Sequence, residues 1–174
     1  MRRMAKSQSR AQPLTDIEQR EFIISHIPGR IRAIQKIVSG GKMTYLELAG
    51  VMVLARSISG FLGISTRNGR LCQDHGYFPH DLGKSWEVKL KDINGGACLK
   101  LSELTNEEQT VLEAGINEAN LAFAHLTFWS SPVHQDARGR ATIDYSQQQI
   151  LKIQRFARTV IELYTRHTAG LPRA

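Results

Sequence analysis

The chain has 174 residues, of which 41% are hydrophobic and 22% charged, a composition typical of one globular domain that folds without covalent staples. Its two cysteines exclude a disulfide framework, and no apolar run approaches the roughly 20 residues that a membrane-spanning helix needs. We therefore expect a cytoplasmic protein with reduced thiols and no membrane partner.

The net charge of +7 is concentrated near the N-terminus. Residues 1–13 carry four basic side chains and no acidic one, so the rest of the chain has a charge of only +3. We expect these residues to form a flexible basic arm, which either contacts the phosphate backbone of a nucleic acid or stays solvated. The basic side chains of the arm are Arg2, Arg3, Lys6 and Arg10.

Two helical patterns follow the arm. Thr15 and Asp16 are suitable N-caps for a first helix, whose apolar members end at Ile24. The sequence HIPGR predicts a break, because Pro28 suits the first turn of a second helix. That second helix is expected to end at the Ser-Gly-Gly sequence of residues 39–41.

Thr44 and Glu47 form a capping-box pattern, which predicts that a third helix runs from about Tyr45 to Leu62. Apolar side chains occur nearly all around this helix, so we expect it to be the buried centre of the fold. Arg56 lies within it, and a buried guanidinium needs a carboxylate, backbone carbonyls or a bound anion. Glu47 and Glu118 are the candidate carboxylates.

Residues 65–85 are expected to form a loop, in which RNGR makes a turn. Apolar and polar residues then alternate between Trp86 and Leu101 around an NGG sequence, which predicts a short β-hairpin. The lysines of this segment, which are Lys89, Lys91 and Lys100, are expected to point away from its apolar face.

Two helices complete the chain. Thr105 and Glu108 form a second capping box, which opens a helix that extends to about His125. After a loop, the last helix is expected from about Ser146 to His167. Its outer side is basic and is a second candidate surface for nucleic acid, with Lys152, Arg155, Arg158 and Arg166.

These patterns predict a mainly α protein, which is a helical bundle of about five helices with one short β-hairpin. We expect one domain from residue 14 to residue 168 and a flexible tail at residues 169–174.

Two motif-like stretches do not fit known sites. SGGKMT lacks the glycine that a phosphate-binding P-loop has four residues before its Gly-Lys pair, and it lies between helices. The stretch CQDHGYFPHD has residue types that bind zinc but no recognised spacing, so a solvated loop is favoured over a metal site. Its candidate ligands are Cys72, Asp74, His75, His80 and Asp81. We predict no metal and no cofactor.

The stretches HIPGRIRAI, LARSISGFLG and INEANLAFAHLTFW occur in an order that resembles HEPN-like helical proteins, from about residue 15 to residue 164. Active members of that family are metal-independent ribonucleases, commonly assembled across a dimer. Their histidine assists proton transfer at the ribose 2′-OH, and an arginine that precedes it with four to six residues in between steadies the phosphate. The resemblance implies that His125 is this histidine. The arginine is absent, because Glu118, Ala119 and Asn120 occupy its positions.

Other side chains could replace the missing arginine. Asn117 and Asn120 lie on the His125 side of the helix and could hold a phosphate as neutral donors, while Arg56 could supply the charge from a neighbouring helix. We therefore name His125, Arg56, Asn117 and Asn120 as candidate catalytic residues. A structural role is the open alternative for His125 as a C-terminal cap and for Arg56 as an ion-pair partner.

Three functions stay open. The first is a HEPN-like protein without nuclease activity, which acts by binding protein or RNA. The second is a metal-independent endoribonuclease of a toxin or phage-defence system. The third is a basic nucleic-acid-binding accessory protein. We expect a homodimer in each case.

Overall fold

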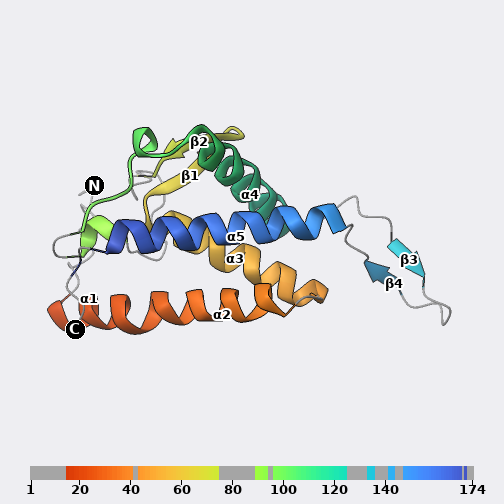
Figure 1. The fold of residues 1–174 in the computed structure, drawn as a ribbon, viewed down its shortest axis with the longest axis horizontal. Coiled ribbons are helices and arrows are strands. Elements are labelled where there is room, and N and C mark those ends of the chain that lie inside the picture. The colour runs from red at the N-terminus through yellow and green to blue at the C-terminus, as the bar shows by residue number, and fades with distance from the viewer. Residues whose placement is uncertain are drawn as a thin grey trace, which may run out of the picture.

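The computed structural model describes residues 15–40, 43–74, 89–93, 96–124, 133–135, 141–143, 147–169 and 171. Within these ranges the chain is mainly helical with short antiparallel hairpins, which confirms the predicted fold class. Figure 1 shows its elements in order: α1 (Asp16–Glu21), α2 (Ile27–Ser39), α3 (Tyr45–Phe61), β1 (Ile64–Arg67), β2 (Arg70–Gln73), α4 (Asn106–Ala124), β3 (Val133–Gln135), β4 (Ala141–Ile143) and α5 (Gln147–Thr168). None of the helices seen in these ranges has the length and apolar character needed to cross a bilayer.

The predicted break between the first two helices is wrong. A π-helical turn, Phe22–His26, joins α1 directly to α2, and the Phe22 carbonyl accepts a hydrogen bond from the Ile27 N–H. The cause is Pro28, which lacks an N–H and whose ring crowds the carbonyl four residues earlier. Widening one turn relieves this crowding without ending the helix.

Helix α3 is the centre of the bundle, as predicted. It contacts α2, α4 and α5, and it contributes buried side chains along one face. The opposite face is not covered, since Leu46 is 78% exposed and Val53 is 42% exposed. Arg56 is also exposed, so the prediction that its guanidinium is buried is wrong.

The capping boxes fix where the helices begin. The Thr44 N–H donates to Glu47 Oε2 at 2.8 Å, and the Glu47 N–H donates to Thr44 Oγ1 at 3.3 Å. These bonds lower the pKa of the Glu47 carboxyl below its usual 4.5, and Thr15 does the same for Glu18 at the start of α1. Local sequence therefore sets both helix starts.

The hairpin lies in a different segment from the one predicted. Strands β1 and β2 pair antiparallel, and Asn68 and Gly69 both have positive φ in the turn between them, at 52° and 77°. This is the backbone of a type I′ turn, for which Asn-Gly is the preferred sequence. A second pair, β3 with β4, lies where a loop was expected.

The segment predicted as a hairpin contains no strand in residues 89–93 and 96–101. It has two short 3₁₀ turns instead, Leu90–Asp92 and Leu101–Glu103, and residues 96–100 form neither helix nor strand. Leu90 and Leu99 are each 1% exposed, so this segment covers the core without pairing. Lys89 was expected to point to solvent, but it is fully buried.

Candidate nucleic-acid interface

A row of polar side chains on α4 holds the β1–β2 hairpin in place. Glu113, Asn117 and Asn120 are spaced by four and three residues, so they lie on one face of the helix. Glu113 Oε2 accepts from the Leu71 N–H at 2.8 Å, and Asn117 Nδ2 donates to the Gly69 carbonyl at 2.7 Å. We call Glu113, Asn117 and Asn120 the α4 polar row.

Asn120 connects this row to α3. Its Nδ2 donates to Thr66 Oγ1 at 3.2 Å, and its Oδ1 accepts a short hydrogen bond from Arg56 Nε. Two of the four candidate catalytic residues, Arg56 and Asn120, therefore lie in direct contact. Asn117 is on the same face of α4 but is bonded to the hairpin. His125 lies outside the described residues.

Arg56 is oriented but not neutralised. Its Nε is bonded to Asn120, while its terminal amino groups have no acceptor among the residues that the structure describes. Neither Glu47 nor Glu118, its predicted carboxylate partners, forms an ion pair with it there. Burial raises the pKa of the Glu118 carboxyl, and the charge of Lys152 partly opposes that rise. Arg56 thus presents charged donors to solvent from a fixed position.

The hairpin adds two further arginines. Arg67 and Arg70 stand directly opposite each other in the register, and both are exposed. In a strand, side chains alternate between faces. Thr66 is bonded to α4 and Leu71 packs against the core, so Arg67 and Arg70 lie on the outer face. The sequence interpretation treated RNGR only as a turn and missed these residues, although an Asn-Gly turn places its two neighbours side by side.

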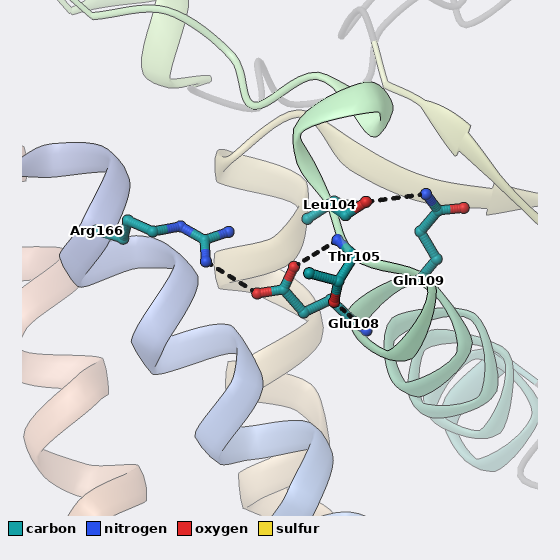
Figure 2. Close-up of polar contacts among 5 residues, drawn as sticks. All are labelled: Leu104, Thr105, Glu108, Gln109 and Arg166. Atoms are coloured by element: carbon teal, nitrogen blue, oxygen red, sulfur yellow. Dashed lines mark hydrogen bonds and ion pairs between the residues drawn. The ribbon is translucent and has the colours of Figure 1, made fainter.

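The predicted basic face of α5 is partly neutralised by the start of α4. Arg155 forms an ion pair with Glu107, and Arg166 Nη1 lies 3.0 Å from Glu108 Oε1. Figure 2 shows the Glu108 carboxylate between the Thr105 N–H and the Arg166 guanidinium. Lys152 and Arg158 are exposed on the same helix. Two of the four basic residues of α5 that were predicted to contact nucleic acid therefore have partners within the fold. The basic residues of the arm fall outside the described ranges; they are Arg2, Arg3, Lys6 and Arg10.

A buried ion pair lies beyond the other end of the hairpin. Lys89 Nζ is 2.6 Å from Asp74 Oδ2, and the Lys89 side chain is only 1% exposed. Burial and the charge of Asp74 raise the pKa of the nearby Cys72 thiol, while Arg67 acts in the opposite direction. This direction disfavours the thiolate, which is the nucleophilic and metal-binding form of cysteine.

Metal ligands do not gather in the part of the chain that is described, where no group of three or more His, Cys, Asp or Glu side chains is arranged to hold an ion. Of the five candidate zinc ligands, Cys72 and Asp74 belong to that part, whereas His75, His80 and Asp81 do not. Comparisons of the chain with protein-family models, curated proteins and solved structures give no match.

Proposed function

We propose that this protein is a cytoplasmic, HEPN-like helical protein that binds RNA through the surface around Arg56 and does not cleave it. The observation that carries the proposal is the state of Arg56, an exposed residue whose Nε is held by Asn120 and whose terminal amino groups have no acceptor among the described residues. A planar guanidinium with free terminal donors suits a phosphate group. Because Asn120 fixes the side chain, less conformational entropy is lost when a phosphate binds.

Binding is favoured over cleavage by the roles of the two asparagines. Asn120 already uses its oxygen for Arg56 and its amide nitrogen for Thr66, and Asn117 donates to the Gly69 carbonyl. Both side chains therefore stabilise the fold through the groups that would otherwise hold a phosphate. A neutral amide also lacks the charge that the family's arginine gives to the developing negative charge.

The test is a titration of labelled, mixed-sequence RNA with the purified protein in EDTA, read by fluorescence anisotropy. We expect Arg56→Gln to weaken binding by at least about tenfold, because a hydrogen bond to a charged group contributes about 1.5–3 kcal/mol. Arg32→Gln is the matched control, because Arg32 is an exposed arginine on α2. Equal affinity of wild type and Arg56→Gln would contradict the proposal.

Gels of the same mixtures separate binding from cleavage. We expect the RNA to stay intact with the wild type. If the wild type cuts RNA and both His125→Ala and Arg56→Gln abolish cutting, the endoribonuclease alternative replaces our proposal.

We also propose that the protein is a homodimer, as its resemblance to HEPN-like proteins implies. Light scattering coupled to size-exclusion chromatography measures the mass directly. A mass equal to the 19.5 kDa of one chain would contradict this part of the proposal.

A further inference from the structure

We infer that Arg67 and Arg70, on the outer face of the β1–β2 hairpin, form a second contact for RNA phosphates, in addition to the proposed contact at Arg56. This inference rests on the proposed function. Its starting point is the register, which places the two guanidinium-bearing residues directly opposite each other at the last pair before the turn. Like charges in directly opposite positions destabilise a strand pair. A phosphate bound between them converts this repulsion into attraction.

Neither hairpin arginine is neutralised from within the fold. Arg67 and Arg70 form no ion pair with any residue that the structure describes. Among the described residues, the carboxylates of Glu113 and Asp74 have partners elsewhere: Glu113 accepts from the Leu71 N–H, and Asp74 is paired with Lys89. The positive charge of the outer face is therefore available to an external anion.

The hairpin is held rigidly enough to serve as a binding surface. The type I′ turn fixes its tip, and the α4 polar row fixes its inner face through Thr66, Gly69 and Leu71. Asn120 is bonded to both Thr66 and Arg56, so one side chain sets the position of the hairpin relative to α3. The fixed backbone determines where Arg67 and Arg70 are attached, which lowers the entropy cost of holding a phosphate chain.

The ligand that this surface fits is the sugar-phosphate backbone, without reading of the bases. Sequence reading of single-stranded RNA needs hydrogen bonds to the base edges, usually with the bases stacked on aromatic or arginine side chains. The outer face of the hairpin carries Ser65, Arg67, Arg70 and Cys72, with no aromatic residue. Phosphate contacts position a nucleic acid but carry no sequence information. We therefore expect binding that depends on salt and not on base identity.

The experiment compares two double variants that remove the same charge. Arg67→Gln/Arg70→Gln removes the hairpin contacts, and Arg32→Gln/Lys36→Gln removes two exposed charges from α2. Each is titrated with labelled poly(U) and poly(A) oligonucleotides at several salt concentrations. We expect the hairpin variant to lose at least tenfold in affinity, and its slope of log affinity against log salt to fall by about 1.4. The α2 variant should stay within about threefold of the wild type, with a slope reduced far less.

Asn117→Ala tests the role of the helix in positioning the hairpin. It removes the hydrogen bond to the Gly69 carbonyl but no charge. We expect weaker binding with the salt slope unchanged, because the phosphate contacts are the same but less well ordered. A slope that fell as far as in the hairpin variant would contradict this role.

Thermal unfolding at low salt tests whether the hairpin variant binds weakly because its fold is destabilised. Removing two like charges should leave the Tm of the hairpin variant unchanged or higher. A clear fall in its Tm would show that the arginines serve the fold, and would overturn the inference.

If the wild type binds RNA and the hairpin variant binds with the same affinity and slope, the inference fails while the proposed function stands. If the wild type binds no RNA at all, the proposed function fails.

Discussion

Glu108 on the first turn of α4 and Arg166 on the last turns of α5 are joined by an ion pair of 3.0 Å (Figure 2). The same carboxylate accepts a hydrogen bond from the Thr105 N–H at 2.7 Å, which caps the start of α4. Glu108 thus caps the start of α4 and also joins that start to the end of α5. This double use makes Glu108 a good site for testing the coupling between capping and packing.

We expect Glu108→Gln to lower the free energy of unfolding by less than about 1 kcal/mol at pH 7, because glutamine can keep the capping-box bond but loses the partly exposed ion pair with Arg166. Burial acts to raise the pKa of Glu108, but hydrogen bonds from Thr105 and Arg166 outweigh it, so the pKa lies below 4.5. A lowered folded-state pKa gives stability above the unfolded value that is lost as the pH falls. The difference between variant and wild type should therefore shrink below about pH 4.5. Urea unfolding of both proteins at several pH values across this range measures the difference. A difference that did not change with pH would contradict a stabilising role of the Glu108 charge.

Glu118→Gln should act in the opposite direction. Burial raises the pKa of Glu118, and Lys152 only partly opposes this. Because the folded state holds the proton more tightly than the unfolded state, stability is greatest at low pH and falls as the pH rises through the folded pKa. The neutral amide should raise the free energy of unfolding at pH 7 by less than about 1 kcal/mol. Loss of stability at pH 7, as expected for Glu108→Gln, would show that the Glu118 carboxylate is stabilising.

Gly115 and Gly50 are helix-interior glycines for which we expect opposite effects of alanine. A Cβ at Gly115 would lie 2.2 Å from Phe156 Cγ in the core, so Gly115→Ala should cost about 1–3 kcal/mol. A Cβ at Gly50 would meet nothing within 4 Å, so Gly50→Ala should stabilise α3 by about 0.5–1 kcal/mol. Thermal unfolding of both variants gives the comparison. A stabilised Gly115→Ala would mean that Phe156 moves aside easily.

Removing one partner of the Asp74–Lys89 ion pair should destabilise the fold more than replacing both partners. Asp74→Ala leaves a buried ammonium group without this carboxylate, for which we expect a loss of about 3–5 kcal/mol. The double variant Asp74→Leu/Lys89→Met should recover most of that loss, because apolar side chains of similar size can replace a buried ion pair. Urea unfolding of the single and double variants measures the coupling. If the double variant is as unstable as the single one, other contacts of these residues dominate.

The helix starts could be predicted from sequence because a capping box is complete within four residues. Thr44 with Glu47 and Thr105 with Glu108 were located correctly on that basis. The hairpin could not be placed in the same way. Alternating apolar residues occur both in strands and in irregular chain that covers a core, as between Leu90 and Leu101. An Asn-Gly pair does not distinguish the two segments either, because one occurs in each, at Asn68-Gly69 and at Asn94-Gly95.

The candidate site was partly predictable. Helical faces suggested that Arg56 could reach the helix carrying Asn120, and the two residues do meet although they are 64 positions apart. The pairing of Arg67 with Arg70 becomes visible only when the strand register is known. Lys89 was misjudged, because a lysine is normally exposed and its partner Asp74 lies in a different segment.

The π-helical turn at Phe22–His26 has a consequence for how related sequences should be aligned. In a regular α-helix, residues five apart point about 140° away from each other. The wide turn instead brings Phe22, which packs beside Phe61, and the fully buried Ile27 to the same side. The turn is equivalent to one inserted residue, so a homologue with an uninterrupted α-helix here should be one residue shorter. An alignment that forces equal lengths would shift every core position of α1 relative to α2.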